Sequence, residues 1–288
     1  MIKTIQWISL ALFILPATVA FGQQTDVPAF LSSDLEFVWE SDNTLEIPES
    51  VFFDAEHACI YVSNIKGAPD GQDENGYLSK LNLKGEIITH KWVTGLHAPK
   101  GMAKYGNYLF VSDINRLAVI DITKGEIVKK YSAPEAIFLN DVSINPKTGT
   151  IYVSDSHDNK IYRLKNGHFT LWLSHEKLAR VNGLCYKNDR LYAGVANAIL
   201  SIDPGSQAIH TEVENTKPID GLLNAGENTW ITSDWAGNIQ IIDSGKIKKV
   251  LSSAEQQINA ADLGYMPEEK IILVPTFRNN RVVAYQVK

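Results

Sequence analysis

The stretch TIYVSD, residues 150–155, is the feature of the sequence that decides the fold. It is a short run of β-branched and aromatic residues that ends in a small and an acidic residue, which is typical of a buried strand. The pattern recurs at 58–64 (ACIYVSN), 108–113 (YLFVSD), 190–195 (RLYAGV), 229–234 (TWITSD) and 271–276 (IILVPT). A repeat of about 40 residues with several strands in each unit predicts a β-propeller. The first spacing is longer because of an insertion, KGAPDGQDENG (66–76), which we expect to form a loop on one face.

Further strands follow in most units, such as KIYRLK (160–165) and HFTLWLS (168–174) in the third. The last unit runs out of chain after its third strand, whereas LEFVWESD (35–42) precedes the first unit as a spare strand. Pairing this strand with the last unit would remove the exposed edges of an open array. We therefore predict an all-β fold, a six-bladed β-propeller over 34–288 that is closed by an N-terminal strand. An open β-sandwich or two small β domains are the alternatives.

The N-terminus has the pattern of a signal peptide over residues 1–22, followed by a linker over 23–33. One lysine precedes an apolar run, IQWISLALFIL (5–15), and small residues follow it. The run is short of the roughly 20 residues that a membrane span needs. We therefore expect a periplasmic or secreted protein with no membrane span in the mature chain, and a retained N-terminal anchor is the alternative.

Charge and cysteine content narrow the classes of partner. The formal net charge is −6 and the chain has no basic runs, which argues against nucleic acid. We expect a monomer that acts on a small molecule. An exported chain with two cysteines would be able to form one disulfide. However, Cys59 and Cys185 lie within apolar strands of different repeats, so buried free thiols are the prediction.

A pair of residues stands in register at the start of each predicted inner strand. The pairs are Glu49-Ser50, Lys100-Gly101, Asn140-Asp141, Asn182-Gly183, Asp220-Gly221 and Ala261-Asp262. Because the inner strands of a propeller line its central channel, the first residues of the pairs should form a ring around the axis. Asn182-Gly183 then does not form a hairpin turn, and we expect its glycine to keep the backbone close to whatever lies in the middle of the channel.

This ring has the chemistry of a hard-cation site. It offers two carboxylates and two carboxamides, without thiol or imidazole, from Glu49, Asn140, Asn182 and Asp220. Such oxygen ligands suit Ca²⁺ ahead of the stricter Mg²⁺, with another divalent ion as a further alternative. A divalent cation would also relieve the repulsion between two carboxylates in an apolar channel. The alternative at each position is a local bond to the backbone, which Asn and Asp often make at strand starts.

Four segments resemble motifs of the regucalcin/gluconolactonase/luciferin-regenerating enzyme family. They are PESVFFD (48–54), FLNDVSINPKTGTIYVSD (138–155), VNGL (181–184) and PIDGLL (218–223). The resemblance runs from about Glu49 to Asp243 and implies a six-bladed propeller. It further implies that Glu49, Asn182 and Asp220 bind a metal directly, and that Asn140 binds the metal or holds a substrate beside it.

The sequence departs from the family pattern at several places. Ser50-Val51 replaces Gly-Pro after the glutamate, and Phe53 replaces a tryptophan. The arginine with which sugar lactonases hold their substrate is Phe138 in this chain, and ADLGYMPEEK (261–270) replaces a Gly-rich segment. The metal site therefore carries over better than the sugar specificity.

The ring and the resemblance together predict a metal-dependent hydrolase of the lactonase or esterase type. Asp220 would activate a water or attack the substrate itself, and Asn140 would orient the scissile carbonyl. Lys100 would bind an anionic group of the substrate, pair with Glu49, or extend its ammonium out of the channel mouth. His97 is a further candidate for a general base. Two alternatives remain open: a non-catalytic propeller that binds a protein or ligand around a structural metal, and, less favoured, a metal-free strictosidine synthase-like propeller.

Overall fold

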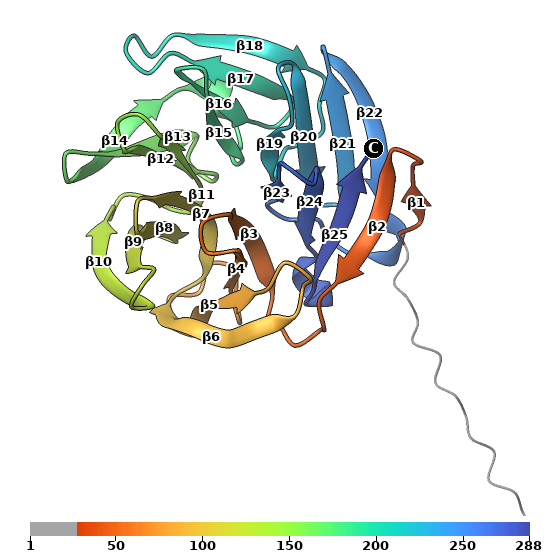
Figure 1. The fold of residues 1–288 in the computed structure, drawn as a ribbon. Helices are drawn as coiled ribbons and strands as arrows, with labels where there is room; N and C mark the ends of the chain where they lie inside the picture. The colour runs from red at the N-terminus through yellow and green to blue at the C-terminus, as the bar shows by residue number, and fades with distance from the viewer. Residues whose placement is uncertain (1–27) are drawn as a thin grey trace, which may run out of the picture.

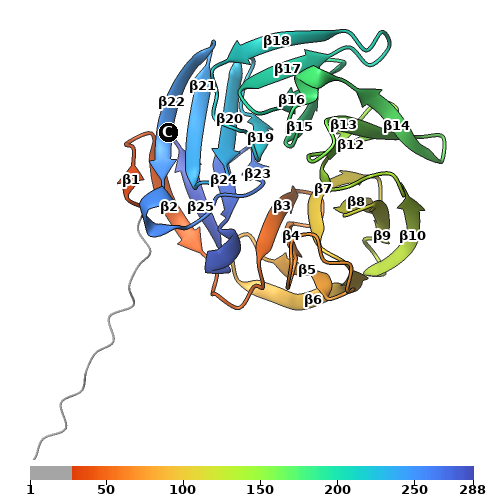
Figure 2. The ribbon, with the colours of Figure 1, turned by 180° about the vertical axis from the view of Figure 1, so that it is seen from behind.

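Six antiparallel sheets stand like blades around one axis in the computed structural model, which describes residues 28–288 (Figure 1). Five sheets have four strands and one has five, which confirms the predicted six-bladed propeller. The expected signal peptide, residues 1–22, lies outside the described residues. In both views β3 and β7 lie near the axis, and β6, β10, β14 and β18 lie at the periphery (Figures 1 and 2).

Blades one to three follow one another along the chain, and each runs from an inner to an outer strand. Blade one consists of β3 (Pro48–Asp54), β4 (Cys59–Asn64), β5 (Gly76–Leu81) and β6 (Ile87–Leu96). Blade two consists of β7 (Pro99–Tyr105), β8 (Tyr108–Asp113), β9 (Arg116–Asp121) and β10 (Glu126–Ser132). Blade three consists of β11 (Leu139–Asn145), β12 (Thr150–Asp155), β13 (Lys160–Lys165) and β14 (His168–Ser174). The insertion 66–76 is a loop between β4 and β5, as predicted.

Blades four to six repeat the pattern, with short 3-10 turns in the connections. Their elements are η1 (Glu176–Leu178), β15 (Leu184–Lys187), β16 (Arg190–Gly194), β17 (Ala198–Ile202) and β18 (Ile209–Glu214); β19 (Leu222–Asn224), β20 (Thr229–Asp234), β21 (Asn238–Asp243), β22 (Lys246–Ser252) and η2 (Ala254–Gln256); β23 (Gly264–Met266), β24 (Ile271–Pro275), η3 (Phe277–Asn279) and β25 (Val282–Val287).

The two ends of the chain meet in the last blade. Strand β2 (Leu35–Glu40) pairs antiparallel with β25, from Leu35 opposite Val287 to Glu40 opposite Val283. This is the closing N-terminal strand that the sequence predicts. Strand β1 (Phe30–Leu31) adds to the outer edge of β22, so part of the stretch expected to be a linker is paired in blade five.

The core lies between neighbouring blades. Every residue of β4 and β12 is buried, because these strands carry apolar side chains on both faces and each face meets another blade. Tyr152 of blade three, for example, lies in one cluster with Leu184 and Leu191 of blade four. Continuous apolar strands of this kind therefore hold the ring together by packing blade against blade.

The cysteines are free thiols, as predicted, with Cys59 buried and Cys185 partly buried. No helix in residues 28–288 has the length and apolar character that crossing a membrane requires.

Candidate functional site

The repeated strand motif fixes the inner strands at the axis. Ser154 of β12 accepts a hydrogen bond from the backbone N–H of Asp141 at 2.9 Å, and the next residue, Asp155, accepts from the N–H groups of Ile137 and Phe138 at 2.8 and 2.9 Å. Blade two repeats the second contact, since Asp113 accepts from the N–H groups just before β7. The Val-Ser-Asp ending therefore anchors the chain immediately before and after the ring position.

Five of the six ring residues line a single cavity of about 480 Å³ at one end of the channel. Glu49, Lys100, Asn140 and Asp220 are buried, and Asn182 is partly buried. The structure thus brings together the four predicted metal ligands and Lys100, whereas His97, the further candidate for a general base, lies outside the cavity lining.

Among the described residues, three side-chain oxygens of the ring have no hydrogen-bond partner, and the nearby Ser156 Oγ in the cavity wall also has none. The three ring oxygens are Glu49 Oε2, Asn140 Oδ1 and Asn182 Oδ1, and each is buried. Asn182 Nδ2 donates to Asp220 Oδ1 at 2.8 Å, which leaves the amide oxygen of Asn182 as the free group. A buried polar atom without a partner costs about 1–3 kcal/mol. Three such oxygens in one cavity fit a hard cation, which would satisfy them together.

The channel also concentrates buried carboxyl groups. Burial raises the pKa of Glu49 well above its usual value, with the Lys100 charge opposing the shift. Burial raises the pKa of Asp220 to about 7, against the hydrogen bond from Asn182 and the charge of Lys100. The pKa of Asp141 rises to about 7 and that of Asp262 also rises, both mainly through burial. A divalent cation would offset the cost of ionising these groups.

Asp141 and Asp262, in the second layer of the ring, join neighbouring blades. Asp141 Oδ2 accepts from the N–H of Leu184 in blade four at 2.5 Å. Asp262 Oδ2 accepts from Ser50 Oγ of blade one at 2.6 Å. Both carboxyl groups therefore hold blade boundaries closed beneath the cavity.

The glycines that follow Asn182 and Asp220 serve blade packing, whereas the sequence led us to expect that Gly183 brings the backbone close to the middle of the channel. A Cβ on Gly183 would lie 2.7 Å from the backbone oxygen of Asp220 and 2.7 Å from the nitrogen of Leu222, and one on Gly221 would lie 2.5 Å from Leu263 N. Neither glycine has a positive φ. Asn182-Gly183 stands at a strand start because the next inner strand passes too close for a side chain.

Lys100 is buried, with 1% of its surface exposed, so its ammonium does not extend out of the channel mouth. Its Nζ donates to the carbonyl oxygen of Pro69 at 2.8 Å and lies 4.5 Å from the centre of the Phe138 ring. Within residues 28–288 no salt bridge of 4.0 Å or less joins it to Glu49 or Asp220. Burial lowers the pKa of Lys100, and the charges of Glu49, Asp113 and Asp220 oppose this shift. Lys100 thus ties the insertion loop to the ring.

Aromatic side chains wall the cavity. Phe138 stacks on His157 with 4.2 Å between ring centres, and Trp235 meets Phe277 edge to face at 4.4 Å. All four of these side chains line the cavity. His97 is not among the residues that line the cavity, and its Nδ1 accepts from the N–H of Glu74 at 3.3 Å.

Arg180 also lines the cavity and was missed in the sequence. The sequence could have indicated Arg180 by its position, because it precedes Asn182 by two residues, as Phe138 precedes Asn140. That comparison between blades would have flagged both side chains as neighbours of the ring.

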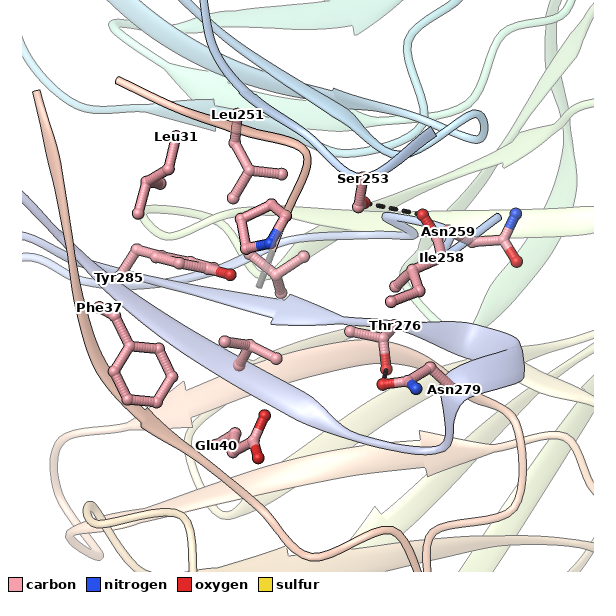
Figure 3. Close-up of a pocket in the computed structure, with 13 residues that line it drawn as sticks. Leu31, Phe37, Glu40, Leu251, Ser253, Ile258, Asn259, Thr276, Asn279 and Tyr285 are labelled. Carbon is pink, nitrogen blue, oxygen red and sulfur yellow. Dashed lines mark hydrogen bonds between the residues drawn. The ribbon is translucent and has the colours of Figure 1, made fainter. Parts of the chain in front are cut away.

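A second cavity, of about 290 Å³, lies between blades five and six and shares no lining residue with the first. Leu31, Phe37 and Leu251 gather at one end and Ser253 and Thr276 at the other (Figure 3). It contains none of the ring residues, so the first cavity is the candidate site.

One cluster of possible metal ligands lies outside the channel, at Asp54, Glu56 and His57. Lys104 Nζ already occupies its centre, at 2.7 Å from Asp54 Oδ1 and 2.8 Å from Glu56 Oε2. His57 Nδ1 bonds the remaining oxygen of Asp54 at 2.8 Å. The lysine charge thus takes the place that a cation would need.

Comparison with known proteins identifies the fold. No family model and no curated protein matches the chain. Among solved structures, it is similar to a chain of a nidogen/laminin complex, with a TM-score of 0.62, 16% identity, and 76% of this chain and 84% of that chain covered. It is also similar to virginiamycin B lyase from Staphylococcus aureus, with a TM-score of 0.62, 12% identity, and 88% of this chain and 100% of that chain covered. At these identities the likeness is one of fold.

Proposed function

We propose that the protein is a metal-dependent hydrolase of the lactonase or esterase type that acts on a small molecule outside the cytoplasm. The observation that carries this proposal is the group of three unpartnered buried oxygens, beside Asp220, in a cavity large enough for a small substrate. The resemblance of the ring motifs to the regucalcin/gluconolactonase family supports the same reaction class. The pattern of residues 1–22 supports export.

Glu49, Asn140, Asn182 and Asp220 would hold the metal, with Ca²⁺ favoured by an all-oxygen set of ligands. A bound Ca²⁺ would polarise the scissile carbonyl and stabilise the negative charge that develops on its oxygen. Asn140 would contribute its Oδ1 to the cation, which leaves its Nδ2 to orient the substrate.

Asp220 is the group best placed to move a proton. Asn182 Nδ2 donates a hydrogen bond of 2.8 Å to Asp220 Oδ1, and Asp220 lines the cavity. As a general base it would take a proton from water while the water oxygen bonds to the carbonyl carbon. The C–O bond of the ester then breaks, and the proton passes to the departing alkoxide. Direct attack by Asp220 is the other route, with water hydrolysing the acyl-enzyme afterwards.

A non-catalytic propeller with a structural metal is the second candidate function. It is favoured by Lys100, whose buried ammonium is bonded to the Pro69 carbonyl rather than available to a substrate. On this alternative, substitution of a ring residue lowers stability and no ester is hydrolysed.

Turnover of a panel of lactones and aryl esters, in EDTA and in Ca²⁺, tests the two functions against each other. The hydrolase predicts activity that needs Ca²⁺ and that Asp220→Asn abolishes, while the exposed control Asp243→Asn retains it. Metal-dependent stability without turnover across the panel would favour the binding module. Activity that survives both EDTA and Asp220→Asn would contradict the proposed site.

A further inference from the structure

We infer that the substrate carries one carboxylate close to its scissile ester or lactone bond, and that Arg180 binds this carboxylate. The inference rests on the proposed function, because it names the substrate class of the same cavity. It is carried by the placement of Arg180, by its lack of a partner, and by the charges that line the cavity.

The backbone holds Arg180 at the cavity wall in a strained conformation. Its φ is +58°, in the left-handed region that bulky residues rarely adopt. Asn159 Oδ1 accepts from its backbone N–H at 3.2 Å, and the next residue, Val181, is fully buried and bonded to Leu178 O at 2.9 Å. Strain of about 1–3 kcal/mol persists where the surroundings enforce it, and it clusters at functional sites.

The guanidinium of Arg180 is available to a ligand. Within residues 28–288 no side-chain hydrogen bond or ion pair occupies it, whereas Arg116 bonds Asp113 and Arg281 bonds Glu40. The other cation in the cavity, Lys100, is occupied by backbone carbonyls. Anion binding therefore falls to Arg180, rather than to Lys100, for which the sequence left this role open as one of three.

Arg180 also lies close to the reacting groups. It precedes the ring residue Asn182 by two positions, and its charge opposes the rise in the pKa of Asp220. A carboxylate on its planar fork would accept two parallel hydrogen bonds, which fixes the orientation of the substrate as well as its position.

The charge balance of the cavity favours a substrate with one negative charge. When all of them are ionised, the acidic side chains of Glu49, Asp70 and Asp220 in the cavity lining exceed the basic side chains of Lys100 and Arg180 by one charge. A divalent metal turns this excess of one negative charge into an excess of one positive charge. A substrate with a single carboxylate restores neutrality, whereas a dianion such as a phosphate monoester overshoots it.

The aromatic side chains in the cavity wall indicate the shape and polarity of the rest of the substrate. The Phe138–His157 pair comes from blade three, and Phe277 comes from blade six, on the opposite side of the ring. Aromatic faces on two sides suit a flat or apolar body. The class is thus a small lactone or ester with one carboxylate beside the reacting carbonyl group.

The test compares two lactones that differ in one charge, 5-oxotetrahydrofuran-2-carboxylate and its methyl ester, with the Ca²⁺-loaded protein. We expect kcat/KM for lactone opening to be about 10- to 100-fold higher for the carboxylate, the range of a charge-assisted pair. Arg180→Gln should bring the ratio near one, mainly through KM for the carboxylate, and Arg180→Lys should restore part of it. The control Arg163→Gln changes an arginine that lies against Trp172, outside the cavity, and should keep the preference.

A binding measurement separates this inference from the hydrolase proposal. Tetrahydrofuran-2-carboxylate has no bond to hydrolyse, and it should raise the Tm of the Ca²⁺-loaded protein but not that of Arg180→Gln. If this shift occurs and neither lactone is opened, the carboxylate site stands and the hydrolase fails. If both lactones are opened equally well and Arg180→Gln changes nothing, the hydrolase stands and the inference is overturned.

Discussion

Removal of divalent cations should make the stability of this protein fall as the pH rises from 5 to 8. Burial raises the pKa of Asp141 and Asp220 to about 7, and it also raises the pKa of Glu49 and Asp262. In the unfolded chain the aspartates titrate near 3.8. Between these values the folded state binds more protons than the unfolded state. The free energy of unfolding therefore decreases as the pH rises through the folded pKa values.

The size of the effect follows from the pKa difference. One carboxyl with a folded pKa near 7 and an unfolded value near 3.8 lowers the free energy of unfolding by about 3 kcal/mol between pH 5 and pH 8. For a chain of this size 1 kcal/mol corresponds to about 2–4 °C. We therefore expect the Tm in EDTA to be roughly 5–10 °C lower at pH 8 than at pH 5.

Thermal melts in EDTA and in Ca²⁺, at intervals from pH 5 to pH 8, measure this dependence. Ca²⁺ should raise the Tm most at pH 8, since protons compete for the same carboxylates at pH 5. Asp220→Asn should make the pH profile in EDTA shallower and reduce the Ca²⁺ effect, and Asp243→Asn should do neither. A Tm in EDTA that stays constant or rises from pH 5 to pH 8 would refute the reasoning.

Three further results are expected. Gly183→Ala should lower the free energy of unfolding by about 1–3 kcal/mol, measured by urea unfolding, because the added Cβ meets the backbone of the next inner strand; an unchanged midpoint would contradict this packing. Lys100→Met should make the loop 66–76 more sensitive to limited proteolysis, since the bond to the Pro69 carbonyl is lost, whereas Lys84→Met, at an exposed site, should not. Cys59 should react with a thiol reagent only after unfolding and Cys185 only slowly before it, because Cys59 is buried, Cys185 is partly buried, and burial raises the pKa of both; fast labelling of Cys59 in the native protein would show that a blade opens.

The fold and the ring could be predicted from the sequence because both follow from local patterns. Strands such as TIYVSD repeat with their turns, and the spare strand at 35–42 matches the strand missing from the last blade. The first residue of each inner strand is fixed by register alone, so Glu49 and Asp220 meet without any knowledge of the loops.

The surroundings of the ring could not be predicted, because they depend on the course of the connections. Arg180 has a left-handed backbone conformation at the cavity wall, which is not expected for an arginine. Lys100 is held by a carbonyl in the insertion loop, 31 residues away in sequence. The neighbours of Gly183 belong to another blade, so the reason for the glycine becomes visible only when two inner strands lie side by side.

The pairing of β2 with β25 has a consequence for biosynthesis. Strand β2 is synthesised before the first strand of blade one, and its partner β25 is the last strand of the propeller to be synthesised. A nascent chain that lacks β25 is therefore unable to complete the last blade. Closing so long a loop makes the final step of folding slow compared with the formation of a single blade. Until then Phe37 and Trp39 are without their strand partners Tyr285 and Ala284. Loss of β25 would therefore leave β2 unpaired as well, and chaperones that recognise apolar strands would have access to β2 until β25 is made.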